Sequence, residues 1–445
     1  MVATQEITQQ SIFEQPAVFN LPDDILYYII KIVMGLIEHD NQRRKIPFRA
    51  GLVCRRWREL TVGSALLWTQ IHFQSHEEGH PLQSLLLERS KASPLSITIV
   101  NKDHDTAMHD ISAIIELIRP HFSRFKSLKI NSASHQALRM MIDEFRASPA
   151  PLLEEFALVG PSSADVWELE PLDGSCWHLS KLILCCGKVN MGGTLVRNLR
   201  WLELGASVGE DVVYTNLTTS HILTILSTAP LLETFILWLG SVQLMPGQPW
   251  RGPQLSLQYL QTLEVHSSQH PVPFVTDLLG NIVAPAICSM KSMRPFPQEY
   301  MGPLIKLPHF PLPGLRNLAI APRRSQVPAY YPTVAEFLKC LPQLQRLEVT
   351  HFVLADRVIS SLSTSCPQLD QMRVYYSEKP KLVQNLQTLI SARRQSLELS
   401  PVRLLELCRR PSLFPSPEDW LTEEEQACLA AEVETFIHGS GIFKA

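Results

Sequence analysis

Apolar residues follow two different spacings along the chain, and the first of them is found near the amino end. Aliphatic side chains recur three and four residues apart from Ile25 to Ile37. This spacing predicts a helix with a broad apolar face. Pro22 suits the first helical position, where its missing N–H is no loss, and Asp23 and Asp24 follow where the helix dipole favours negative charge.

A polar stretch ends this helix, and two more short apolar segments come next. A second helix is predicted at Phe48–Leu60, with its arginines mostly facing solvent. The segment Ala65–Trp68 is a third short apolar piece and leads into Ile71–Phe73. Together they predict a small three-helix domain at residues 19–73, preceded by a polar tail at residues 1–18.

The second spacing begins after residue 74 and repeats many times. An apolar residue is followed by a second one three positions later and by a third one two positions after that, and most of these units start 20 to 33 residues apart. Side chains alternate in an extended segment, so the last two residues of each unit point to one face. One short strand cannot bury such a face alone, whereas stacked copies share a continuous core. The copies are Phe125/Leu128/Ile130, Leu153/Phe156/Leu158, Leu179/Leu182/Leu184, Leu199/Leu202/Leu204, Leu232/Phe235/Leu237, Leu260/Leu263/Val265, Leu315/Leu318/Ile320, Leu344/Leu347/Val349 and Leu369/Met372/Val374, with a degenerate copy at Ile287/Met290.

Helical stretches lie between these units, for example His221–Ser227 and Thr333–Leu341. Proline often precedes the leading leucine, as at Pro230 and Pro342, and it ends a helix because it pushes its predecessor into extended geometry. The period is typical of leucine-rich repeats. We therefore expect an α/β fold in which residues 74–400 form an irregular leucine-rich-repeat solenoid with the shape of a horseshoe.

The end of the chain departs from this pattern. Two proline-rich segments, 246–253 and 295–313, are interpreted as loops at repeat boundaries, and the pattern fades after Pro401. Residues 401–445 are expected to form a cap segment with a C-terminal helix, which either closes the solenoid or docks a partner. A capping box at Thr422–Glu425 begins that helix. Its apolar face and its stop at glycine are predicted from Leu429, Val433, Phe436, Ile437 and Gly439.

Composition narrows the class of protein. With 445 residues, 45% of them apolar, the chain can bury a large core. The formal net charge of −3 leaves no basic surplus for a run of phosphates, so we expect no nucleic-acid partner. The nine cysteines form no Cys-x-x-Cys pair, which indicates a reducing compartment. No secretory leader or membrane-spanning stretch is recognised, so we expect a cytoplasmic or nuclear protein without a membrane partner.

Three short motifs occur in order near the amino end. Leu21-Pro22-Asp23-Asp24-Ile25-Leu26 is followed by Leu52-Val53-Cys54-Arg55-Arg56-Trp57 and then by Leu67-Trp68. This arrangement, at Phe19 to Ile71, resembles an F-box. The repeats behind it resemble those of the F-box/leucine-rich-repeat branch of that family.

The resemblance implies a non-catalytic subunit without a cofactor. An F-box docks on the Skp-family adaptor of a cullin ubiquitin ligase, while the rest of the chain selects a substrate protein for ubiquitin-dependent degradation. Carried over by position, the adaptor-binding residues are Leu21, Pro22, Ile25, Leu26, Ile29, Val53, Cys54, Trp57 and Trp68. Substrate binding is expected on the inner face of the solenoid, where the strand residues that alternate with the core are Glu203, Trp238, Glu264, His266, Glu348, Arg373 and Tyr375. Trp238 is the strongest single candidate, because an exposed Trp is uncommon and useful at interfaces.

Three alternatives to a ligase subunit stay open. The first is a Skp-bound scaffold that acts outside any ligase. A bare repeat scaffold, capped by its own amino-terminal helices, is another possibility. The distant alternative is a zinc hydrolase, since His76-Glu77-Glu78-Gly79-His80 matches H-E-x-x-H. That chemistry requires a helix, and both Gly79 and the following Pro81 disfavour one there.

Overall fold

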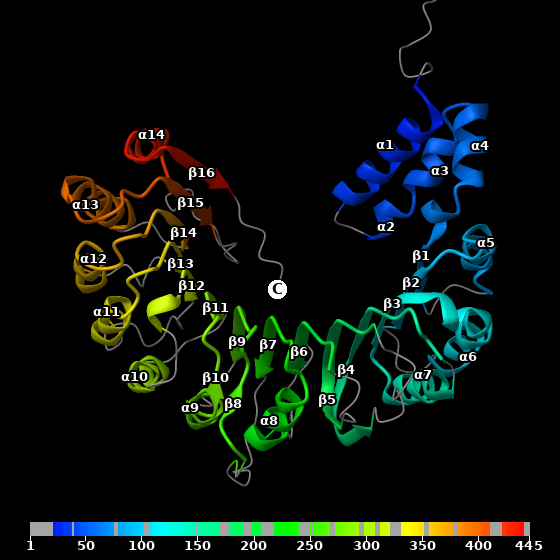
Figure 1. Cartoon of the computed structure of the whole chain (residues 1–445). Coiled ribbons are helices and arrows are strands. Elements are labelled where there is room, and N and C mark those ends of the chain that lie inside the picture. The colour runs from blue at the N-terminus through cyan, green and yellow to red at the C-terminus, as the bar shows by residue number, and fades with distance from the viewer. Residues whose placement is uncertain are drawn as a thin grey trace, which may run out of the picture.

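The computed structural model joins a small helical domain to one long curved sheet (Figure 1). It describes residues 21–37, 40–74, 79–101, 107–147, 149–168, 178–190, 197–205, 218–239, 250, 252–267, 272–292, 298–307, 312–320, 331–350, 356–376, 381–409 and 421–439. The sheet lines the inner side of an arc and the helices cover its outer side. The helical domain and the last strand stand on either side of the opening of this arc.

The helical domain contains more helices than the three that the sequence predicts. Its elements are α1 (Asp23–Leu36), α2 (Asp40–Arg43), α3 (Ile46–Gly51), α4 (Arg55–Gly63) and the 3-10 helix η2 (Ala65–Trp68). The single helix predicted at Phe48–Leu60 is therefore wrong. The chain turns at Leu52 and Val53, and Arg58 of α4 donates from Nε to the carbonyl oxygen of Gly51 at 3.0 Å. Gly at the end of α3 and the β-branched Val53 both weaken a continuous helix.

One correction concerns the start of α1. Pro22 is extended, with φ −56° and ψ 153°, and it precedes the helix instead of occupying the first helical position. The aspartates follow it in the first turn, as predicted. Arg56 of α4 holds this end in place, because its guanidinium donates to the Asp23 carboxylate at 2.8 Å and to the carbonyl of Leu21.

The main sheet has 14 strands, and all neighbouring strands are parallel. The strands are, in their order across the sheet, β1 (Gln70–Gln74), β2 (Leu95–Asn101), β3 (Phe125–Ser132), β4 (Glu155–Glu168), β5 (Lys181–Asn190), β6 (Trp201–Gly205), β7 (Thr234–Leu239), β9 (Thr262–Ser267), β11 (Ser289–Ser292), β12 (Asn317–Ile320), β13 (Arg346–Thr350), β14 (Gln371–Tyr376), β15 (Leu404–Arg409) and β16 (Thr435–Gly439). Two further short strands, β8 (Leu255–Ser256) and β10 (Ile282–Val283), pair with each other.

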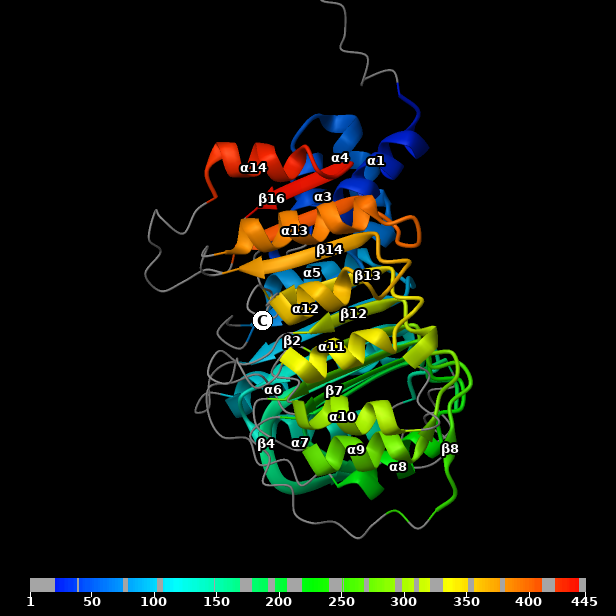
Figure 2. The same cartoon turned by 90° about the vertical axis from the view of Figure 1, so that its left-hand side faces the viewer.

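The outer side of the arc is covered by helices that connect successive strands (Figure 1). They are α5 (Pro81–Arg89), α6 (Ala107–Ile118), α7 (His135–Ala147), α8 (Thr219–Ser227), α9 (Val272–Gly280), α10 (Gln298–Lys306), α11 (Tyr331–Lys339), α12 (Asp356–Leu362), α13 (Leu382–Gln395) and α14 (Glu423–Ala430), with the 3-10 helices η3 (Arg119–Arg124) and η5 (Leu312–Gly314). Figure 2 shows these helices stacked side by side along the array. The helices predicted between repeats are confirmed in α8 and α11.

The strand register confirms the predicted repeats. The second apolar residue of each unit lies opposite its equivalent in the next strand, as in Leu128 opposite Phe156 and Leu347 opposite Met372. The degenerate copy keeps this register too, because Met290 lies between Leu263 and Leu318. The stacked units share one continuous hydrophobic core. The mixed α/β architecture with a long parallel sheet is that of a repeat solenoid.

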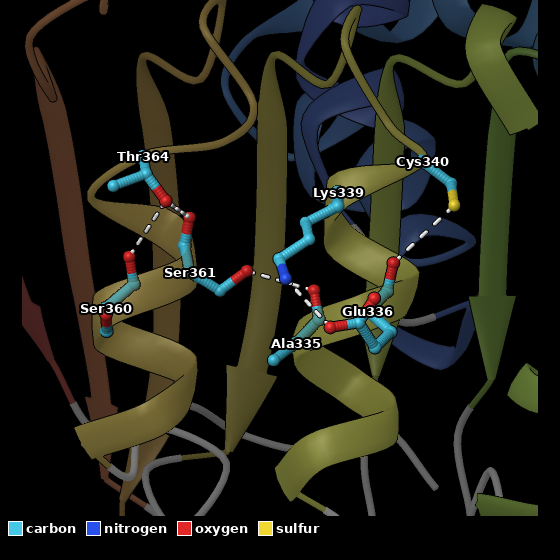
Figure 3. A network of polar contacts seen from close by, with 7 residues as sticks. All are labelled: Ala335, Glu336, Lys339, Cys340, Ser360, Ser361 and Thr364. Carbon is cyan, nitrogen blue, oxygen red and sulfur yellow. Dashed lines mark hydrogen bonds and ion pairs between the residues drawn. The ribbon is translucent and has the colours of Figure 1, made fainter.

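Neighbouring helices also contact each other directly through polar groups. The Ser361 hydroxyl of α12 donates to the carbonyl oxygen of Ala335 in α11 at 2.9 Å (Figure 3). Within α11, Lys339 pairs with Glu336 at 2.8 Å. The repeats that contain α11 and α12 therefore contact each other through both their strands and their helices.

A buried arginine ties the carboxyl-terminal repeats together. Arg393 of α13 is fully buried, and no carboxylate of the described residues pairs with it. Its guanidinium instead donates five hydrogen bonds, at 2.7–3.2 Å, to backbone carbonyls. The accepting carbonyls belong to Leu362, Ser365, Cys366, Leu369 and Ser400. All five N–H donors of the side chain are thus used.

The end of the chain corrects the predicted C-terminal helix. The capping box is confirmed, since Thr422 accepts from the amide of Glu425 and Glu425 accepts from the amide of Thr422. The helix α14 ends at Ala430, however, so Phe436 and Ile437 do not belong to it. They lie in β16, which pairs with the free edge of β15. The backbone pairing with β15 and the packing of alternate side chains favour a strand there, although the apolar residues also have a helical spacing.

No helix in the described part of the chain is long and apolar enough to cross a bilayer.

Candidate protein-interaction surfaces

Helix α1 is apolar on two sides, and only one of them is buried in the helical domain. Leu26, Ile30 and Met34 form the buried side. The opposite side carries six large hydrophobic residues, which we call the α1 surface. They are Ile25, Tyr28, Ile29, Ile32, Val33 and Leu36, and they are between 37% and 77% exposed.

The α1 surface is one continuous stripe. At 100° per residue its six members fall within an arc of about 140°. A helix that is apolar over so much of its circumference is normally buried on all of it. In the described residues nothing covers the α1 surface, so it has the character of an interface.

The predicted adaptor-binding residues divide into two groups. Ile25, Ile29 and Val53 are exposed apolar residues, and Pro22 is exposed beside them in sequence. Leu21, Cys54 and Trp57 are half-buried.

Leu26 and Trp68 must be corrected, because both are buried in the chain's own core. Trp68 packs edge-to-face on Phe48 at 4.9 Å, and its indole Nε1–H donates to the carbonyl of Thr61 at 2.7 Å. Arg89 covers the indole at 4.7 Å. These side chains stabilise the helical domain and offer no surface to a partner.

Sequence reasoning missed four members of the α1 surface: Tyr28, Ile32, Val33 and Leu36. The signal was available, since they continue the three- and four-residue spacing on the face opposite Leu26. Leu52, at the turn after α3, is a further exposed apolar residue that was not predicted.

The predicted substrate-binding residues lie on the inner strands and form two clusters. The first brings together Glu203, Trp238, Glu264 and His266 from β6, β7 and β9. The Trp238 indole donates from Nε1 to Glu203 at 2.7 Å and stacks on His266, with 3.9 Å between ring centroids. His266 Nε2 contacts the Glu264 carboxylate at 3.1 Å.

Lys291 of β11 joins this cluster at 4.0 Å from Glu264 and was not predicted. Burial pushes the pKa of Glu264 upward, but the hydrogen bond from His266 and the charge of Lys291 outweigh it and lower that pKa. The Glu264 carboxylate is thus held in its charged form. His266 must be corrected as an exposed residue, because its side chain is only 4% exposed beneath Trp238.

The second cluster contains Glu348, Arg373 and Tyr375, together with Glu406 of β15, which sequence reasoning missed. Arg373 pairs with Glu406 at 2.7 Å and with Glu348 at 3.6 Å. Burial by itself lowers the pKa of Arg373, but the hydrogen bond to Glu406 and the nearby negative charges outweigh this effect and raise the pKa. Burial, and then the charge of Glu348, raise the pKa of Tyr375 to about 12. Arg373 thus pairs with both carboxylates and neutralises one of their two negative charges.

The zinc-hydrolase alternative is contradicted by the backbone. Residues 76–78 of the motif lie outside the described residues, but Gly79 and His80 have φ of +66° and +46°. Two left-handed residues cannot belong to the right-handed helix that would place both imidazoles on one metal. Among the described residues no group of three His, Cys, Asp or Glu side chains has the arrangement of a metal site.

Comparison with known proteins adds little. No protein-family model and no curated protein sequence matches the chain. A solved structure described as "Crystal structure of Rad7 and Elc1 complex in yeast" aligns over 94% of this chain and 94% of that chain, with 9% identity and a TM-score of 0.34. A likeness at this TM-score carries no argument about function. What stands is an α/β repeat architecture with an exposed apolar helix at one end and charged clusters along its inner strands.

Proposed function

We propose that the chain is a substrate receptor of a cullin ubiquitin ligase, which docks on a Skp-family adaptor through α1 and holds a substrate protein on its inner strands. The observation that supports the proposal is the α1 surface. Helix α1 begins directly after Leu21-Pro22, in the segment that resembles an F-box. This resemblance suggests the class of partner that the α1 surface binds.

The α1 surface is large enough for a specific interaction. Fully burying one such side chain is worth about 1.5–3 kcal/mol, and these six begin about half exposed. Covering all of them would therefore contribute on the order of 5 kcal/mol before association costs. A few apolar anchors usually carry most of the energy of an interface, and here they lie on one pre-formed helix.

The helical domain is also joined firmly to the repeats. Trp68 lies directly before β1, and its neighbour Thr69 accepts from the amide of Ser96 in β2 at 2.9 Å. The domain therefore caps the sheet and presents the α1 surface at the same time, so a capping role and a docking role are compatible.

The test replaces two residues near the middle of the α1 surface, Ile25→Asp with Ile32→Asp. Co-purification with a Skp-family adaptor should fall at least 100-fold, because two anchors are lost and two charges are buried. The control is Leu152→Asp with Leu231→Asp. Those leucines are 43% and 38% exposed, close to Ile25 and Ile32 at 43% and 44%, but they lie in repeat turns.

Leu26 is left unchanged in this variant, because it is buried and an aspartate there would unfold the domain. Undiminished adaptor binding by the α1 variant would overturn the docking proposal. Recovery of adaptor without any cullin would instead assign the chain to a scaffold outside a ligase.

A further inference from the structure

The indole of Trp238 is fixed in orientation at the middle of the inner face. Glu203 accepts its Nε1–H, and the imidazole of His266 stacks on one side of the ring at an interplanar angle of 19°. His266 is itself held by Glu264 and is almost fully buried. The ring therefore needs no ordering when a ligand arrives, and this lowers the entropic cost of binding.

On the other neighbouring strand, the residue opposite Trp238 has no side chain. Gly205 of β6 lies directly opposite Trp238 in the register. Its φ is +148°, and a Cβ there would lie 2.2 Å from the Trp238 carbonyl oxygen. Close approach of the two strands thus requires glycine at this position.

The charge around the indole is negative. Glu203 forms no ion pair with any Lys or Arg of the described residues, and within them its carboxylate accepts from the neutral indole. Glu264 carries a second negative charge, and Lys291 is the one described cation that pairs with it, at 4.0 Å. In the second cluster each carboxylate has a cationic partner, because Arg373 pairs with both Glu348 and Glu406, at 3.6 and 2.7 Å.

A second polar group points to a ligand. The His266 side chain is only 4% exposed, and its buried Nδ1 atom has no hydrogen-bond partner among the described residues. A buried polar atom without a partner is uncommon in a folded protein. It belongs to the ring that stacks on Trp238, whose indole N–H donates to Glu203.

We propose that Trp238 and Glu203 form a recognition site for an arginine side chain of the partner protein. The planar guanidinium stacks on the free side of the indole and donates to the Glu203 carboxylate. Arginine suits this site better than lysine, because its delocalised cation stacks on aromatic faces and pairs bidentately with a carboxylate. An acidic or phosphorylated segment is repelled by Glu203 and Glu264. The identification of the partner as a ligase substrate rests on the proposed function.

The test follows the Trp238 indole N–H signal by NMR, assigned through its loss in Trp238→Phe. The probes are acetyl-Gly-Arg-Gly-amide and the same peptide with citrulline, which keeps the shape of arginine and removes its charge. The arginine peptide should shift the signal saturably, and the citrulline peptide should bind at least tenfold more weakly. An equal effect of both peptides overturns the proposal.

A matched pair of variants locates the charge. Glu203→Gln keeps an acceptor for the indole N–H and removes the carboxylate, so affinity for the arginine peptide should fall at least tenfold. Glu155→Gln removes an inner-face carboxylate of β4 that Lys181 already pairs at 3.0 Å, and affinity should not change. An unchanged affinity in Glu203→Gln overturns the proposal.

The same variants separate this site from the docking surface. Glu203→Gln should still co-purify with the adaptor, and the Ile25→Asp, Ile32→Asp protein should still bind the arginine peptide. If adaptor binding is absent in the unaltered protein while arginine binding persists, the arginine site is supported and its assignment to a ligase substrate is overturned.

Discussion

Replacing Arg393 by methionine should destabilise the carboxyl-terminal repeats strongly. Arg393 is fully buried and supplies five donors to backbone carbonyls that come from the end of α12, the turns beside it and the segment before β15. Methionine fills a similar length of the cavity but donates nothing. The perturbation therefore removes hydrogen bonds while leaving much of the packing.

The magnitude follows from these contacts. Each hydrogen bond from a charged donor is worth about 1.5–3 kcal/mol, so five of them represent on the order of 10 kcal/mol. Several kcal/mol of this offsets the burial of the guanidinium, which also lowers its pKa. The carbonyl of Cys366 keeps a second donor, the amide of Leu369 at 3.0 Å. We expect a net loss of about 3–5 kcal/mol, because a buried carbonyl left without a donor costs about 1–3 kcal/mol and removing the buried charge offsets part of the total.

Two control variants make the test specific. Arg393→Lys keeps the charge with three donors and should lose about 2 kcal/mol. Arg394→Met removes the neighbouring arginine, which is half exposed and makes one ion pair with Glu432, and should lose at most about 1 kcal/mol. The assay is urea unfolding combined with hydrogen exchange over β14 and β15, since repeats can unfold separately. If Arg393→Met unfolds like Arg394→Met, the assigned role of the buried guanidinium is refuted.

Two further outcomes test the carboxyl-terminal strands. Burial lowers the pKa of His438 below its ordinary 6.5, and His438 Nε2 contacts the Tyr376 hydroxyl at 2.7 Å. The stability contributed by neutral His438 is therefore complete above pH 6.5 and is lost as the pH falls toward the lowered pKa. The fall in the urea midpoint between pH 7.5 and 5.5 should be smaller in His438→Gln, and an equal fall would contradict this assignment. Burial raises the pKa of Cys366 to about 12, so iodoacetamide at pH 8 should modify exposed Cys428 and leave Cys366 unmodified in the folded protein. Equal labelling of both thiols by peptide mass spectrometry would show that Cys366 is accessible.

The repeat core was predictable because alternation within a strand leaves only one way to bury two apolar residues. The units of β1, β2, β15 and β16 were not predicted. In β15 the residues Val402, Leu405 and Leu407 keep the apolar spacing, although the pattern was expected to fade after Pro401, whereas in β1 and β16 other residues occupy some of its positions. Trp68, Ile71 and Phe73 follow the same spacing as the internal copies, with a tryptophan in the leading position. The resemblance of Leu67-Trp68 to an F-box motif placed Trp68 on an adaptor contact, although the residue belongs to the first repeat.

In the last unit a polar residue replaces one of the three apolar residues of the repeat. Val433, Phe436 and His438 take the three repeat positions in β16, and the imidazole meets the buried hydroxyl of Tyr376. A histidine in an apolar position hides the pattern in the sequence. The sequence also did not predict that Gly205 lies opposite Trp238, because this depends on the register between β6 and β7.

The firm junction at Trp68 has a geometric consequence. Because the helical domain shares the core of the first strands, the distance between a protein held by α1 and one held at Trp238 is set by the number of strands between them. From β1 to β7 the sheet advances six strands, or about 29 Å along the arc at about 4.8 Å per strand. Gaining or losing one repeat in this span would change the reach of the molecule by about 5 Å and would leave both contact areas intact. The number of strands in the array thus sets the spacing between the two surfaces, in steps of one strand.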